Sequence, residues 1–189
     1  RVEERYQNLD TRIMSGFDVA LYYSFINTLG NFNLAFNIAK LEKFKQKAGN
    51  DFIKLIEAQE NGIIPNELAI TGFSDLIEKD GSPEIQASFK FLWNKDSWGL
   101  GLFGKHIGEF YETRNKLSDG RLWKVKAYNT INGHIDYYIN SNSSNSRIRL
   151  GINNITDERA PLASEIFGYY FDKHDNLGRY YYLDMSYKF

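Results

Sequence analysis

Apolar and polar residues alternate with a period of two along most of the chain, and this pattern is typical of half-buried β-strands. In the first such segment, Val19 and Leu21 share one parity, and Asp18 and Ser24 lie on the other. The alternation restarts after the turn sequence NTLGN (27–31). These two segments predict a hairpin of two long strands.

The same alternation predicts five further strands, so we expect seven strands in all. The five begin near Ile85, Trp98, Trp123, Ile148 and Arg179. The strand that begins at Trp98 is expected to run toward HIGEFYETR, and the last strand ends at the C-terminus.

The connections between these strands alternate between short turns and longer loops. The turns cover 27–31, 94–97 and 140–146, and the loops cover 48–83, 113–122 and 156–178. In the first loop, DFIKLIEAQ predicts a short helix capped by Asn50 or Asp51. A transmembrane β-barrel has this asymmetry, because its periplasmic turns are short and its outer loops are long. Several expected strands also reach the ~9–11 residues that a tilted membrane strand needs.

The period does not decide what covers the apolar side of the strands, which meets either lipid or a protein core. Trp93 and Trp98 flank the turn at 94–97, where the aromatic girdle of a membrane barrel would lie. They are also acceptable core residues of a hairpin. The loop asymmetry favours the girdle.

Composition narrows the classes of function. Lys and Arg total 23 against 24 Asp and Glu, so the net charge of -1 argues against nucleic-acid binding. The absence of Cys excludes disulfides and Cys-ligated metals, and three scattered His residues do not predict a metal site. The sequence contains no nucleophile elbow, P-loop, dinucleotide fingerprint or zinc motif, so we do not expect an enzyme.

The final strand carries a more specific pattern. Its alternating residues are Tyr181, Leu183, Met185, Tyr187 and the C-terminal Phe189. An aromatic C-terminus on an alternating last strand resembles the outer-membrane β-signal. The resemblance implies that the outer-membrane assembly machinery reads these five residues.

Two segments near the C-terminus are similar to TonB-dependent outer-membrane receptors. RIRLGINNITDERAP (147–161) resembles their penultimate strand, and GRYYYLDMSYKF (178–189) resembles their closing strand. GSPEIQASFKFLW and WKVKAYNTINGHIDYYI resemble earlier barrel strands. The resemblance implies an all-β fold, an antiparallel transmembrane β-barrel segment with about seven of the ~22 strands of a full barrel. Residues 1–189 would then be the C-terminal part of the barrel, without the plug domain.

The same resemblance implies a function. The parent protein would be an integral receptor and transporter of the Gram-negative outer membrane, embedded in the lipid bilayer. It would take up a large scarce solute, of which ferric siderophores are the commonest class, and haem, cobalamin and glycans are others. The TonB complex would act through the missing N-terminal part, and no cofactor is implied.

Residues in the outer loops are the candidates for solute binding, because aromatic rings and Arg suit siderophore or haem contacts. Phe110, Tyr111 and Arg114 border the medium loop, and Tyr169, Tyr170 and His174 lie in the last long loop. The alternative is that these aromatic residues pack the loops on one another. For the whole chain, the alternative to a receptor is a soluble, lectin-like β-sandwich that binds carbohydrate.

Overall fold

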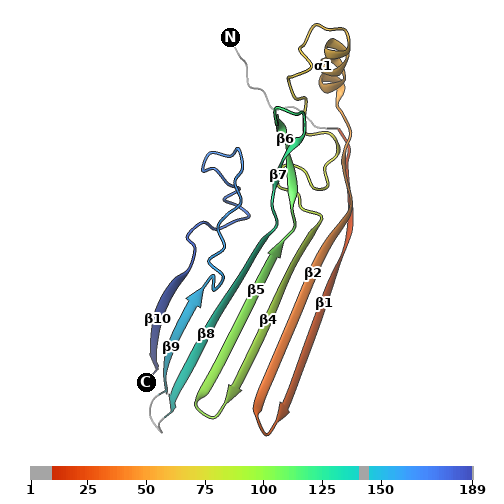
Figure 1. Ribbon diagram of the computed structural model, residues 1–189. Helices are drawn as coiled ribbons and strands as arrows, with labels where there is room; N and C mark the ends of the chain where they lie inside the picture. The colour runs from red at the N-terminus through yellow and green to blue at the C-terminus, as the bar shows by residue number, and fades with distance from the viewer. Residues whose placement is uncertain (1–9, 141–144, 189) are drawn as a thin grey trace.

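A computed structural model describes residues 10–140 and 145–188 of the chain, and these residues form an all-β, antiparallel structure with one helix. Its main sheet has the order β1-β2-β4-β5-β8-β9-β10, so each long strand pairs with the next long strand along the chain (Figure 1). These strands are β1 (Arg12–Asn27), β2 (Gly30–Gln46), β4 (Ile85–Lys95), β5 (Trp98–Ile107), β8 (Tyr128–Asn140), β9 (Asn145–Asn153) and β10 (Tyr180–Lys188). The seven long strands predicted from the period of two are thus confirmed among the described residues, but the fifth begins at Tyr128 and not near Trp123.

The register aligns residues of one parity into continuous rows across the sheet. One row is apolar on every strand: Phe25, Phe32, Trp93, Leu100, Ile135, Leu150 and Leu183. We call this side of the sheet the apolar face. A row on the opposite side contains Asn37, Ser88, Lys105 and Thr130, and we call that side the polar face.

Three positions show how large rings fit into the sheet. Phe89, His134 and Tyr182 each pair across strands with a glycine. The ring lies where a Cβ atom of that glycine would stand: Gly104 for Phe89, Gly101 for His134 and Gly151 for Tyr182. The glycine therefore gives the ring a place on the backbone of the neighbouring strand, as in aromatic rescue of glycine in sheets.

The long connections gather at one end of the sheet and the short turns at the other (Figure 1). β1 and β2 are joined by two residues, Thr28 and Leu29, and β4 and β5 by Asp96 and Ser97. The connections at the far end cover 47–84, 108–127 and 154–179. We call these three segments together the cap.

The first connection contains helix α1 (Asn50–Glu60) and the two-residue strand β3 (Ser74–Asp75), which pairs with β2. The helix was predicted from the sequence, but the predicted N-cap residue, Asn50 or Asp51, was wrong. Gly49 occupies the N-cap position and no side chain caps the helix, while Asp51 lies in the first turn, where its charge suits the helix dipole. No helix of the described residues is long and apolar enough to cross a membrane.

The second connection differs from its prediction. The strand that begins at Trp98 leaves the main sheet after Ile107, and the next residues form a separate hairpin of β6 (Phe110–Lys116) and β7 (Leu122–Val125). The physical reason is burial at the base of the hairpin, where Phe110 and Val125 are 0% exposed and Ile107 is 1% exposed. The most buried large side chains described therefore lie at the cap end and not on the apolar face.

Candidate functional site

Strand β6 is the centre of the cap, because the other two connections bind to it. Its residues Phe110, Glu112 and Arg114 share one parity, and Tyr111 and Thr113 share the other. Phe110 and Glu112 are buried, whereas Arg114 is exposed. The inner side of β6 thus carries an apolar ring, a carboxylate and a guanidinium in succession.

The first connection binds β6 through its backbone and one carboxylate. The Tyr111 N–H donates to the Glu78 carbonyl at 2.8 Å, and the Asp80 N–H donates to the Tyr111 carbonyl at 2.9 Å. The Asp80 carboxylate accepts hydrogen bonds from the backbone N–H and the hydroxyl of Thr113. Asp80 has a φ of 43°, a left-handed conformation that Asp tolerates better than most residues.

The last connection binds the hairpin through three different contacts. The Ser164 N–H donates to Glu112 Oε1 at 2.7 Å, and Trp123 Nε1 donates to the Leu162 carbonyl at 2.8 Å. The ring of Tyr170 meets Phe110 edge-on, with centroids 4.9 Å apart. All three connections therefore form one structure around β6.

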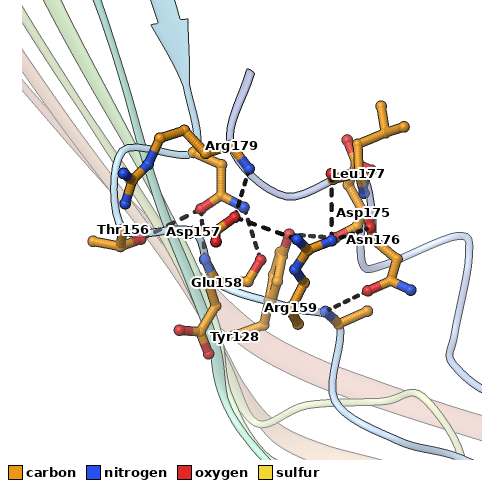
Figure 2. A network of polar contacts seen from close by, with 11 residues as sticks. Tyr128, Thr156, Asp157, Glu158, Arg159, Asp175, Asn176, Leu177 and Arg179 are labelled. Carbon is orange, nitrogen blue, oxygen red and sulfur yellow. Dashed lines mark hydrogen bonds and ion pairs between the residues drawn. The ribbon is translucent and has the colours of Figure 1, made fainter. Parts of the chain in front are cut away.

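The two ends of the last connection are held together by the network in Figure 2. The Arg179 N–H donates to Asp157 Oδ1 at 2.8 Å, and the Tyr128 hydroxyl donates to the Asp175 carbonyl at 2.7 Å. The guanidinium of Arg159 donates to the Asn176 carbonyl at 3.3 Å. These contacts attach the segment that carries His174 to the end of the main sheet.

His174 lies in an aromatic cluster with Phe110, Tyr128 and Tyr170. Its ring stacks on Phe110 at 6.1 Å and meets Tyr128 edge-on at 5.1 Å. Only 3% of His174 is exposed, and neither ring nitrogen has a partner among the described residues. Burial, together with the positive charge of Lys105, lowers the pKa of His174 to about 4, so the imidazole is neutral at pH 7.

Two cavities lie beside this cluster. The upper cavity, of about 270 Å³, lies between the three connections and is lined by Thr71, Gly72, Asp80, Glu112, Arg114, Ser164, Glu165 and Tyr170. The lower cavity, of about 410 Å³, lies between the polar face and the segment 171–178. Its lining includes Lys105, Thr130, Asn132 and Asn153 from the strands and His174 from the loop.

The charges around the upper cavity are mostly negative. Burial raises the pKa of the Tyr170 hydroxyl, and the carboxylates of Glu112 and Asp80 raise it further. Tyr170 therefore stays protonated and remains a hydrogen-bond donor at neutral pH. The described residues contain no group of three or more His, Asp or Glu side chains that could hold a metal ion.

The structure places the six solute-binding residues predicted from the sequence in three environments. Phe110, Tyr170 and His174 contact one another in the aromatic cluster. Arg114 and Tyr170 line the same cavity. Tyr111 is half-buried with Lys124 Nζ 5.9 Å from its ring centre, and the half-buried Tyr169 lines neither of the two cavities.

Sequence reasoning missed the carboxylates Asp80, Glu112 and Glu165 and the strand residue Lys105. Glu112 had a usable signal, because it lies two residues after Phe110 and a strand places such residues on the same side. A charged residue that shares a strand side with a buried ring is a candidate for a buried polar site. Asp80 and Glu165 carried no comparable signal, because their position depends on how the loops fold.

The last strand, β10, pairs antiparallel with β9, and Leu183 stands opposite Leu150. Tyr181, Leu183, Met185 and Tyr187 are 56–74% exposed, and their cross-strand partners place them on the apolar face. Phe189, the last residue of the predicted assembly signal, lies outside the described residues. No described strand pairs with the outer edge of β10.

Comparison with known proteins gave no match to a family model, to a curated protein or to a solved structure. The resemblance to TonB-dependent receptors therefore stays a prediction from the sequence.

Proposed function

We propose that the chain is the C-terminal part of the β-barrel of a TonB-dependent outer-membrane receptor. In this proposal the apolar face meets lipid, the polar face meets the barrel interior, and the cap lies outside the cell. The parent protein takes up a large scarce solute, and a ferric siderophore is the leading class. In the parent protein, an N-terminal part would couple the barrel to the TonB complex.

The exposure of the apolar face is the observation that carries this proposal. Among the seven residues of the apolar row, none is buried, and Ile135, Leu150 and Leu183 are 50–64% exposed. Leu21 and Tyr23 on β1 are 61% and 59% exposed on the same face. An apolar surface of this extent is costly in water and is normal on a strand that faces hydrocarbon.

The distribution of aromatic residues and connections supports the same proposal. Trp93 and Trp98 lie on the apolar face near the short turns, and Trp98 packs against Tyr137 with ring centroids 4.8 Å apart. Aromatic rings at this level suit a membrane interface. Short turns at one end and a folded cap at the other suit the periplasmic and outer ends of a barrel.

The alternative is a soluble, lectin-like β-sandwich. A sandwich buries the inner face of each sheet against a second sheet. The second sheet among the described residues is the two-stranded β6–β7 hairpin, and it leaves the apolar row unburied. The free edges of β1 and β10 also need strand partners, which further barrel strands of the parent would supply.

Fractionation of the full-length parent protein tests the proposal. We expect it in the membrane pellet after a carbonate wash, extractable only with detergent, and with a different electrophoretic mobility before and after heating. A parent that stays in the aqueous phase without detergent contradicts the proposal and favours the sandwich. Growth rescue of a receptor-null strain by individual iron sources would then identify the solute.

A further inference from the structure

Most of the charged side chains that line the upper cavity are acidic. Three carboxylates line it, from Asp80, Glu112 and Glu165, and Arg114 is the cationic side chain in its lining. Each of the three connections contributes lining residues, so the cavity exists only when the cap is assembled. Hydroxyl groups of Thr71, Ser164 and Tyr170 complete the polar lining.

Glu112 distinguishes this cavity from a solvated acidic patch. The residue is 3% exposed, and its Oε1 accepts the hydrogen bond from the Ser164 N–H. Its Oε2 is buried and has no hydrogen-bond partner among the described residues. A buried carboxylate oxygen without a donor is costly, because it has lost its water and gained nothing in return.

No described cation of the protein supplies the missing partner. Arg114 is exposed and forms no ion pair with a described residue, although it lines the same cavity. Lys79 donates to the Asp75 carbonyl, and Lys173 pairs with Asp172. Burial is the main cause of the raised pKa of Tyr170, and the three carboxylates of this cavity raise the pKa further, as a locally negative potential would.

We propose that the upper cavity binds the protonated amine of a small solute, with Glu112 Oε2 as its counter-ion. An ammonium group brings three N–H donors, which match the unpaired Oε2 of Glu112 and the hydroxyl groups of the lining. A volume of about 270 Å³ accommodates an alkylamine or an amine-bearing part of a larger solute. A bare metal ion suits the cavity less, because its carboxylates do not form a metal-ligand group.

This inference rests on the proposed function in one respect, namely that the ligand is a solute captured at the outer surface. The binding itself does not require a membrane. The probes are butylammonium, 1-butanol and butyrate, which have the same chain length and differ in charge. Saturation-transfer NMR on the full-length parent protein would measure their binding. We expect butylammonium to bind, and neither butanol nor butyrate to compete with it.

Variants at two positions locate the binding. Glu112→Gln keeps an oxygen for the Ser164 N–H and removes the charge, so the Kd for butylammonium is expected to rise at least tenfold. The matched control is Glu109→Gln, which removes the exposed carboxylate that pairs with Lys124 outside this cavity. If Glu112→Gln does not fold, Glu165→Gln should weaken binding severalfold while the cap stays assembled.

Several results would overturn the inference. These are no butylammonium binding, equal binding of butanol, unchanged affinity in the folded Glu112→Gln protein, or occupation by Ca²⁺ in place of the amine. The two proposals fail separately. If the parent protein is water-soluble and binds the amine, this inference holds and the proposed membrane function is wrong. If the parent protein inserts into the membrane and binds no amine, the membrane function holds and this inference is wrong.

Discussion

Asp136 on β8 and Arg149 on β9 form a two-point ion pair across the polar face. Arg149 Nε donates to Asp136 Oδ1 at 2.6 Å, and its Nη2 donates to Oδ2 at 2.9 Å. The residues are direct cross-strand partners, and the Asp136 side chain is 5% exposed. A buried carboxylate held in this way fixes the register of β8 on β9, because a slip by one residue would turn Arg149 to the apolar face.

Arg149→Ala is therefore expected to destabilise the folded protein by ~3–5 kcal/mol, since it removes the guanidinium from a buried carboxylate and leaves it only the weaker contact with the Tyr138 hydroxyl at 3.3 Å and the neighbouring ring of His134. The control is Arg147→Ala on the same strand, whose partner Asp184 has a side chain that is 48% exposed, and which should cost only ~0–1 kcal/mol. Urea unfolding of the full-length parent, followed by the heat-dependent mobility shift, would compare them. Equal losses would contradict a special role of the buried pair.

Leu21 and Tyr22 on β1 offer a test of which face meets lipid. They are 61% and 73% exposed and lie on the apolar and polar faces, respectively. In a membrane, Leu21→Arg should cost ~2–4 kcal/mol near the bilayer centre, while Tyr22→Arg should have little effect. The amount of folded protein in the outer membrane is the measurement. Two equally tolerated variants would remove the lipid assignment of the apolar face.

Gly104 on β5 is expected to tolerate no side chain, because the ring of Phe89 occupies the space where its Cβ atom would lie. Gly104→Ala should destabilise the protein by ~1–3 kcal/mol through overpacking. Gly49→Ala is the control for added volume, since nothing lies within 4 Å of a Cβ atom there, and its cost of ~1 kcal/mol or less comes from the N-cap position, where Ala is less favourable than Gly. The double variant Gly104→Ala, Phe89→Leu should lose less free energy of unfolding than the two single variants lose together. Additive losses would mean that ring and glycine do not interact.

Because His174 is buried as a neutral imidazole, we expect the cap to become less stable in acid. The unfolded chain protonates a histidine near pH 6.5, whereas the folded cap keeps His174 neutral down to about pH 4. Its contribution to stability is thus fully present above pH 6.5 and is lost as the pH falls toward 4, by at most ~3 kcal/mol.

Hydrogen exchange of residues 154–179, corrected for the intrinsic effect of pH, would measure this loosening. His174→Phe should flatten the pH dependence. His106→Gln should keep it, because His106 lies on β5 and contacts Asn129 on β8. If hydrogen exchange in the His174→Phe variant depends on pH as in the unchanged protein, another group causes the pH dependence.

Deletion of Phe189 is expected to reduce the amount of folded parent protein in the outer membrane, because the C-terminal aromatic residue would complete the assembly signal. Lys188→Ala changes the neighbouring residue of the other parity and serves as the control. Heat-modifiable protein in the membrane fraction is the measurement. Undiminished folded protein after the deletion would count against the assembly signal.

The amino-acid sequence by itself determined the seven long strands and the separation of polar from apolar faces. A period of two needs no knowledge of distant residues, and Leu21, Phe36 and Phe89 reveal their common face by parity alone. The turn signals also placed the long connections at one end. Local chemistry was misleading at the helix, where Gly49 and not Asn50 or Asp51 is the N-cap.

Only the tertiary structure decided the site. Asp80, Glu112 and Glu165 lie on three different connections, and their shared cavity depends on long-range packing around Phe110 that no local pattern encodes. The cross-strand partners of His134 and Asp136 were likewise settled by register, because pairing joins residues far apart in the chain. Parity shows which way a side chain points, but contacts between loops show what it meets.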